Sequence, residues 1–385
     1  MTALGEFALW IALPISFWGM AMGFVGGRQG RGDLILSGER SVYVVFALLA
    51  IASLAITNAF LTDQFQYYYV ANYSNRDLDT YFKLSGLWAG QRGSLVFWAV
   101  LLSFFASITV FQNRNKNREF MPYVVGVLQG ILGFFLVVLL FAKVNPFQQL
   151  GFMPPDGAGL NPQLQNYWMT IHPPVLYLGF TAFAIPFSFA MASLMIGRTD
   201  SRWIVVTRRW TLVSWFFLTN GIIFGMRWAY EELGWGGYWF WDPVENASLL
   251  PWLTATAFLH SIMIQENRGM LKIWNMSLVL LTFLLTIFAT FLTRSGLIES
   301  VHSFAQNTSI ALIFLAFMGS IFIASVILII YRLPGLRAEN QIESFLPGRR
   351  PSSSTTWCCW ALPLPSSGER SSPWSVRPPR GSRWR

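Results

Sequence analysis

Residues 121–143 read MPYVVGVLQGILGFFLVVLLFAK, an apolar run whose one charged residue, Lys143, stands at its far end. A helix of about 20 apolar residues crosses the hydrocarbon core of a bilayer, so this stretch predicts a membrane span. Comparable runs recur along the 385-residue chain, in which 54% of residues are hydrophobic and only 12% are charged. Soluble domains carry about 25% charged residues. The sequence therefore predicts an all-α fold, a polytopic transmembrane helical bundle.

Nine membrane spans are expected from the apolar runs. The first has no Lys or Arg before it and so lacks the basic start of a cleaved signal peptide. The expected spans are 7–27, 41–61, 94–111, 121–143, 173–196, 210–226, 248–265, 273–293 and 309–331.

Basic residues alternate between the loops, which predicts the orientation of the bundle. The loops after spans 2, 4, 6 and 8 carry five basic residues: Arg76, Lys83, Arg92, Arg227 and Arg294. The shorter loops after spans 1, 3, 5 and 7 carry twelve: Arg28, Arg31, Arg40, Arg114, Lys116, Arg118, Arg198, Arg202, Arg208, Arg209, Arg268 and Lys272. Cytoplasmic loops are the ones enriched in Lys and Arg, so we expect the N-terminus outside.

The segment GWGGYWFWDPVEN (234–246) falls in one of the outer loops under this topology and combines large rings, glycines and acids. The rings can stack on a flat ligand, and the glycines permit close approach of the backbone. An interfacial aromatic belt is the alternative, because Trp and Tyr concentrate at membrane surfaces. A belt needs neither the glycines nor the acids. We therefore expect this loop to contact a planar ligand through Trp235, Gly236, Gly237, Trp239, Trp241, Asp242, Pro243, Glu245 and Asn246.

The chain has three histidines. His172 stands just before the fifth span and His302 just after the eighth, so both are expected at the outer surface, on either side of the aromatic loop in sequence. His260 lies inside the seventh span, roughly 18 Å along that helix. Neutral imidazole is a common axial ligand of haem iron, and a histidine within the membrane is a functional candidate. Hydrogen bonding to headgroups or backbone is the alternative for each histidine alone.

Motifs for other chemistries do not occur in the sequence. It has no H-E-x-x-H zinc motif, no G-x-S-x-G nucleophile elbow and no P-loop. Most of the net charge of +9 comes from the Arg-rich C-terminal tail, so the charge gives no indication of nucleic-acid binding. A solute transporter is less favoured, since span interiors hold almost no charged residues.

WGGYWFWDPVEN resembles the tryptophan-rich "WWD" signature of haem-handling proteins of c-type cytochrome biogenesis, a superfamily that includes CcmC, CcmF and the CcsA-type synthases. LWAGQRGSLVFW, LNPQLQNYWMTIHPPVLYLGF and TFLTRSGLIESVHSFA are similar to the CcmF family, the haem lyase subunits of bacterial system I. The resemblance runs through residues 1–345, and CcmC is shorter.

This resemblance implies functions for the histidines. His172 and His302 match the two outer histidines that bind incoming haem b, delivered by the haem chaperone CcmE. His260 matches one of two membrane histidines that ligate a resident b-type haem. No histidine follows His302, so the partner of His260 is missing from this chain.

The resemblance also implies an activity, haem lyase. Two thiols of an apocytochrome c C-x-x-C-H segment add across the haem vinyl groups; the substrate supplies these thiols, and residues 1–347 contain no cysteine. Implied partners are apocytochrome c, CcmH/CcmI-type subunits and the lipid bilayer, with the site on the periplasmic face of the inner membrane. A haem transporter or scaffold without lyase activity and a CcsA-type synthase remain alternatives.

Two domains are expected: a transmembrane haem-handling domain over 1–346, with its tryptophan-rich loop at 227–247, and a tail over 347–385. The tail is rich in Ser, Pro and Arg and holds both cysteines, Cys358 and Cys359. It is predicted either as a disordered basic segment or as the product of a shifted reading frame.

Overall fold

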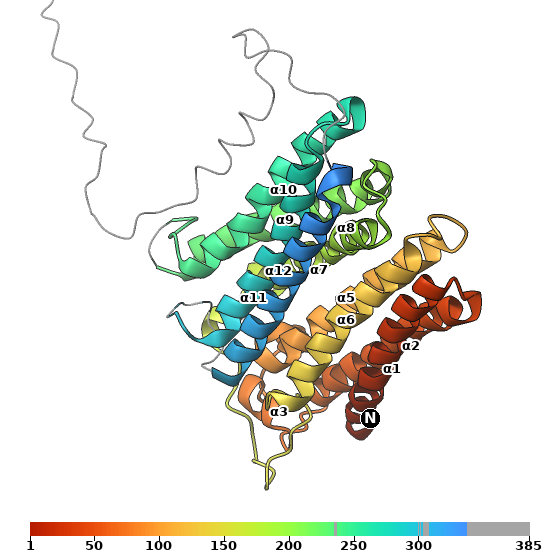
Figure 1. The fold of residues 1–385 in the computed structure, drawn as a ribbon. Helices are drawn as coiled ribbons and strands as arrows, with labels where there is room; N and C mark the ends of the chain where they lie inside the picture. The colour runs from red at the N-terminus through yellow and green to blue at the C-terminus, as the bar shows by residue number, and fades with distance from the viewer. Residues whose placement is uncertain (235–236, 299, 301, 303–307, 337–385) are drawn as a thin grey trace, which may run out of the picture.

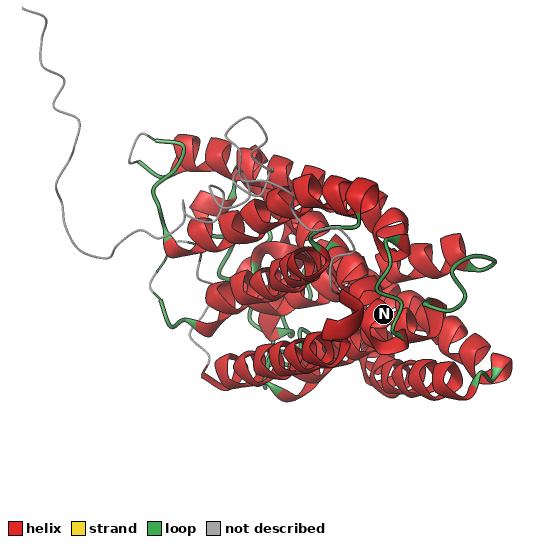
Figure 2. Cartoon of the chain, turned by 45° about the horizontal axis from the view of Figure 1, so that its top comes forward, coloured by secondary structure: helices red, strands yellow, loops and turns green. Residues whose placement is uncertain are grey.

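The computed structural model describes residues 1–234, 237–298, 300, 302 and 308–336. Helices make up the bundle, and the described residues form no strand beyond one isolated bridge between Tyr67 and Gln149 (Figure 2). The predicted tail lies outside the described residues.

The helices, in chain order, are α1 (Thr2–Gln29), α2 (Gly32–Leu61), α3 (Tyr68–Tyr73), α4 (Thr80–Ala89), α5 (Gln91–Asn113), α6 (Met121–Phe141), the 3₁₀ turn η1 (Pro162–Leu164), α7 (Tyr167–Ala182), α8 (Ala184–Ile196), α9 (Arg202–Glu232), α10 (Pro243–Arg268), α11 (Lys272–Ser295) and α12 (Thr308–Leu336).

Every one of the nine expected spans coincides with a long helix, the fifth with α7 and α8 in succession. Eight are long and apolar enough to cross a membrane: α1, α2, α5, α6, α7 with α8, α10, α11 and α12. The exception is α9, whose middle carries polar residues such as Thr219 and Asn220. At about 1.5 Å per residue this 31-residue helix is still long enough to run through the bundle.

The bundle has an N-terminal group of helices, α1, α2, α5 and α6, and a second group formed by α7 to α12 (Figure 1). In the second group α7 packs on α9, α10 on α11, and α12 on α11, while α6 and α8 join the two groups. Small residues on α1 let the first helices approach closely: a Cβ on Gly23 would lie 2.5 Å from the Pro122 carbonyl oxygen.

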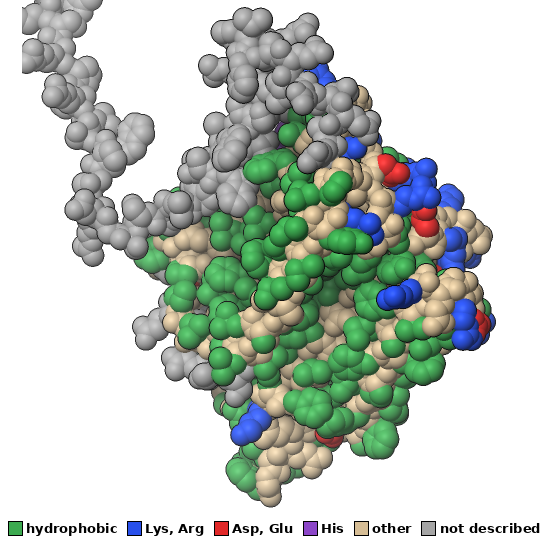
Figure 3. Space-filling view, viewed as in Figure 1, with side chains coloured by type: hydrophobic (Ala, Val, Ile, Leu, Met, Phe, Trp, Pro, Cys, Tyr) green, Lys and Arg blue, Asp and Glu red, His purple; other side chains and the backbone are tan. Residues whose placement is uncertain are grey.

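The surface matches a membrane environment. Hydrophobic side chains cover the middle of the visible face, and Lys and Arg side chains gather mostly towards one end (Figure 3). The opposite end, which we call the site end, is where α5 and α10 begin and α9 and α11 finish.

The sequence pair Pro173-Pro174 predicts the end of a helix, because proline lacks a backbone N–H and its ring clashes with the preceding turn. This prediction is wrong: both prolines lie inside α7, which begins six residues earlier at Tyr167. The break comes at Phe183, where α8 follows α7.

Candidate functional site

The tryptophan-rich segment links α9 to α10 through residues 233–242, and its end is fixed by a helix cap. Asp242 is the N-cap of α10, and its carboxylate accepts a hydrogen bond from Val244 N at 3.0 Å. Glu245 completes the capping box by accepting from the Asp242 amide at 3.1 Å and from the Phe240 amide at 3.0 Å. Pro243 occupies the first helical position, where a missing N–H costs nothing. Both acids of the segment thus have a structural function.

The described rings of this segment do not form one flat surface. Trp239 is partly buried and packs against the core, whereas Trp241 is 62% exposed and meets Trp239 edge-on at 87°. Tyr238 stacks on Tyr230 of α9 with ring centroids 4.5 Å apart. Asn246 donates to the Trp241 carbonyl oxygen at 3.1 Å. Trp235 and Gly236 lie outside the described residues.

His172 stands in α7 and is anchored to the neighbouring helix α9. Its Nδ1 lies 2.6 Å from the carbonyl oxygen of Gly221. A carbonyl oxygen only accepts, so Nδ1 carries the proton, and Nε2 keeps the lone pair that a metal needs. Gly225, one turn along α9, leaves room for the ring: a Cβ there would lie 2.7 Å from His172 Cε1.

His302 follows α11 and is anchored to the N-terminus of α10. Its Nδ1 lies 3.1 Å from Asp242 Oδ2, and its ring meets Trp228 edge-on at 5.5 Å. A carboxylate also only accepts, so Nδ1 of His302 is the donor, and Nε2 is again left for a ligand. Both imidazoles therefore have the same tautomer, set by different acceptors.

Asp242 accepts three hydrogen bonds on one oxygen, from His302 Nδ1, Ser300 Oγ at 2.7 Å and Val244 N. Burial of the carboxyl raises its pKa, but the hydrogen bonds from His302 and Ser300 outweigh burial and hold the pKa of Asp242 below its ordinary value. The carboxylate is therefore charged at neutral pH and able to stabilise a donor at His302.

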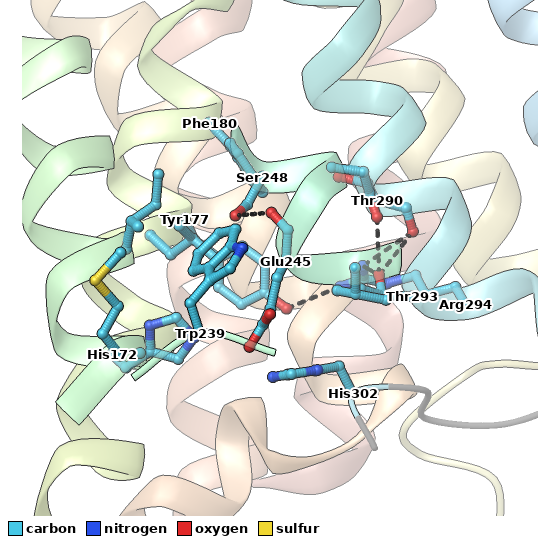
Figure 4. A pocket seen from close by; sticks show the side chains of 16 residues that line it. His172, Tyr177, Phe180, Trp239, Glu245, Ser248, Thr290, Thr293, Arg294 and His302 are labelled. Atoms are coloured by element: carbon cyan, nitrogen blue, oxygen red, sulfur yellow. Dashed lines mark hydrogen bonds between the residues drawn. The ribbon is translucent and has the colours of Figure 1, made fainter. Parts of the chain in front are cut away.

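His172 and His302 line the same cavity, which holds about 620 Å³ of empty space including its mouth. Trp239 and Glu245 lie between the two imidazoles (Figure 4). Most of the other lining side chains are apolar or aromatic, among them Leu176, Tyr177, Phe180, Ile222, Met226 and Val244.

Arg294 of α11 forms part of the cavity wall and is only 1% exposed. Its guanidinium donates to Ser94 Oγ of α5 at 2.8 Å and to the Tyr177 hydroxyl of α7 at 3.2 Å. This side chain ties three helices together beside the cavity.

His260 lies elsewhere. It is exposed on α10, with Nδ1 2.8 Å from the Thr256 carbonyl oxygen, and it does not line the cavity. The structure thus brings His172, His302, Trp239 and Glu245 together and separates them from His260. Gly237 and Asn246 do not line this cavity either.

The donor set suits a metal that brings its own equatorial ligands. The described residues hold no group of three or more His, Cys, Asp and Glu side chains that could bind a bare metal ion, whereas zinc sites use three or four protein ligands. The chemistry of the lining is compatible with a porphyrin: each anchored imidazole has an Nε2 that can ligate iron, and the apolar and aromatic side chains suit the faces of the ring.

Several site residues were missed in the sequence: Gly221, Gly225, Trp228, Ser300 and, as a wall residue, Arg294. The spacing G-x-x-x-G in NGIIFGM (220–226) was an available indication, because small residues four apart mark close helix contacts in membranes.

Known proteins similar to this chain act in cytochrome c maturation. A family model described as "Cytochrome C assembly protein" matches residues 88–299. The "Cytochrome c-type biogenesis protein CcmF" of Haemophilus influenzae is 38% identical over 343 residues, which are 89% of this chain and 53% of that protein. Its counterpart in Pseudomonas aeruginosa is 40% identical over 337 residues, 87% of this chain and 51% of that protein.

A solved structure named "Cytochrome c Heme Lyase CcmF" matches with a TM-score of 0.73 and 34% identity, over 86% of this chain and 51% of that one. The chain spans about half the length of the curated relatives it matches. The eight apolar helices found among the described residues, together with its bacterial relatives, make the chain a multi-pass protein of the inner membrane. On the match of residues 88–299 and on these relatives, the chain belongs to the cytochrome c assembly protein family.

Proposed function

We propose that this chain binds haem in the cavity between His172 and His302 and takes part in its covalent attachment to apocytochrome c. One observation carries the proposal: two imidazoles line one cavity, and each has its Nδ1 held by an acceptor and its Nε2 left for iron. The relatives named CcmF, and the solved structure named as a haem lyase, support the same reading.

In the attachment step, each cysteine thiol of apocytochrome c adds across one haem vinyl group. A carbon–sulfur bond forms, the vinyl double bond is lost, and the thiol hydrogen ends on the neighbouring carbon, so nothing is released. The chain's own contribution is to hold the porphyrin by its iron, cover its faces with apolar side chains and fix its orientation. Haem lyase activity is therefore the proposed enzymatic function, with haem and apocytochrome c as substrates.

The orientation and partners belong to the same proposal. The excess of Lys and Arg at the opposite end of the bundle supports a site end that faces the periplasm, with the N-terminus outside. The haem chaperone CcmE and CcmH/CcmI-type subunits are the proposed partners there.

A second haem site at His260 is proposed separately. The imidazole is exposed in the middle of an apolar helix, and its Nδ1 is held by a backbone carbonyl, which leaves Nε2 for iron. His172 and His302 line the other cavity, so a second imidazole for this site is not among the described residues.

Haem titration of the purified chain in detergent tests the cavity. We expect a bis-imidazole absorption spectrum, with its Soret and α bands, that is lost in the double variant His172→Ala/His302→Ala and retained in His260→Ala. Equal spectra in the double variant and the wild type would refute the outer site.

A haem scaffold without lyase activity is the other candidate, because the two anchored imidazoles account for haem binding but not for attachment of haem to a thiol. Complementation of holocytochrome c formation in cells separates the two, because a scaffold binds haem but leaves the apocytochrome unmodified.

A further inference from the structure

A second cavity, which we call the polar pocket, opens at the site end beside the histidine cavity. It is formed where α3, the first turn of α5, the end of α6 and residues 158–162 meet, and it holds about 1140 Å³ of space including its wide mouth. The residues that decide its chemistry are Tyr68, Asn72, Tyr73, Arg92, Lys143 and Asn161.

The polar pocket and the histidine cavity share a wall. Gln91 lines the polar pocket, and its side-chain amide donates to the backbone carbonyl of Arg294 at 3.1 Å. Arg294 in turn lines the histidine cavity. A ligand in the polar pocket would therefore be separated from one in the histidine cavity by Gln91 and Arg294.

The charge of the polar pocket is positive. Arg92 and Lys143 line it, and among the described residues no Asp or Glu does. The Arg92 guanidinium is held in place by neutral groups: it donates to the Asn145 carbonyl oxygen at 2.9 Å and to Gln148 Oε1 at 2.8 Å, and it lies 4.3 Å from the centre of the Tyr68 ring. Glu6 is a nearby acid, bonded to Asn145 at 3.1 Å from outside the lining.

Neither cation forms an ion pair within the part of the chain that the structure describes. A positioned guanidinium surrounded by neutral acceptors suits a carboxylate, which it can bind through two parallel hydrogen bonds.

The remaining lining groups favour a polar ligand. Asn72, Tyr73 and Asn161 bring amide and hydroxyl groups, and the aliphatic side chains are few: Val144, Ala158, Leu160 and Pro162. A lipid tail or a porphyrin face needs larger apolar walls, of the kind that line the histidine cavity. A polypeptide segment with an acidic side chain matches both the charge and the amide-rich surface.

We propose that the polar pocket binds a carboxylate-bearing segment of a polypeptide and holds it next to the haem cavity. This rests on the proposed function, in which a thiol-bearing polypeptide must reach haem at the site end. Arg92 and Lys143 then bind the carboxylate, and the shared wall of Gln91 and Arg294 sets the position of the polypeptide relative to haem.

The test uses the full chain in detergent and a short fluorescein-labelled peptide of Gly, Ser and Glu, blocked at both ends, alongside its counterpart with Gln in place of Glu. Fluorescence anisotropy should show that the Glu peptide binds more tightly, and that Arg92→Gln/Lys143→Gln weakens its binding by roughly tenfold. The matched control is Arg114→Gln/Lys116→Gln, which removes the same charge from the opposite ends of α5 and α6 and should leave binding unchanged.

Equal peptide binding by the two double variants would overturn the proposal. Inorganic phosphate and phosphatidylglycerol vesicles serve as competitors, each at a concentration of negative charge matched to that of the peptide. The polypeptide assignment would be overturned if either competitor displaced the peptide and the protein bound the Glu and Gln peptides equally well. The haem spectrum of Arg92→Gln/Lys143→Gln should match the wild type. If haem binding instead fails in the wild type while the peptide preference persists, the proposed function falls and the polar pocket stands.

Discussion

Asp242 Oδ2 lies 3.1 Å from His302 Nδ1, and the same carboxylate caps α10. One side chain thus links the start of a membrane helix to the orientation of a candidate haem ligand. The aspartate of the tryptophan-rich segment acts in the site as an anchor for the imidazole.

The substitutions Asp242→Asn and Asp242→Ala separate these two functions. Asparagine is a good N-cap but carries no charge, so Asp242→Asn should keep the cap of α10, lose only the stabilisation that the charged carboxylate contributes, and lower haem affinity by roughly 10–100-fold. Asp242→Ala should in addition lower the free energy of unfolding by about 1 kcal/mol, because the cap is lost. Haem titration and thermal unfolding in detergent measure the two effects, and unchanged haem affinity in Asp242→Asn would show that His302 is oriented by other contacts.

The pH dependence of stability follows from the lowered pKa of Asp242. A carboxyl whose pKa is lower in the folded state stabilises the fold above its unfolded pKa, near 4, and this contribution disappears as the pH falls through the folded value. The difference in unfolding temperature between the wild type and Asp242→Asn should therefore be constant near neutral pH and shrink below about pH 4. A difference that grows on acidification would contradict the lowered pKa.

Gly225 should be essential to the position of His172. A Cβ at this residue would lie 2.7 Å from His172 Cε1, closer than real contacts allow. We expect Gly225→Ala to displace the imidazole and to lower haem affinity at least tenfold. Losses of this size are typical when a metal-ligating histidine loses the contact that orients its ring. Gly319→Ala in α12 is the control, because nothing lies within 4 Å of its added Cβ. Equal haem titrations of the two variants would mean that the ring moves aside at no cost.

The fold was predictable to the level of its helices, since long apolar runs are sufficient evidence for membrane spans. The exception among the spans, α9, shows where apolar runs stop being sufficient, because its polar residues reduce its hydropathy. Its packing against α7 depends instead on Gly179, Gly221 and Gly225. Composition alone does not report such contacts.

The candidate site was predictable in part. His172 and His302 stand 130 positions apart, and the expectation that they flank the aromatic segment in sequence said nothing of a shared cavity. Their acceptors, the Gly221 carbonyl and Asp242, depend on how α7, α9 and α10 pack. The Pro173-Pro174 pair lies within α7 although prolines usually end helices, because prolines within a membrane helix are tolerated where neighbouring groups satisfy the freed carbonyls.

Arg294 should contribute more to stability than any of its single partners. The guanidinium is almost fully buried and donates to Ser94 and Tyr177 on two other helices. Arg294→Met should lower the free energy of unfolding by about 2–3 kcal/mol, because the buried hydroxyls of Ser94 and Tyr177 lose their common donor. Tyr177→Phe and Ser94→Ala each remove one acceptor and should cost about 1 kcal/mol.

The combination Arg294→Met/Tyr177→Phe distinguishes this hydrogen-bond network from simple packing. If Arg294 acts through its bonds, the double variant should be less destabilised than the sum of the single variants, because the Tyr177 bond is lost only once. Chemical unfolding in detergent, followed by tryptophan fluorescence, measures all three variants. Strict additivity would show that Arg294 stabilises the bundle by filling space, and that the contact between α11 and α7 does not depend on its charge.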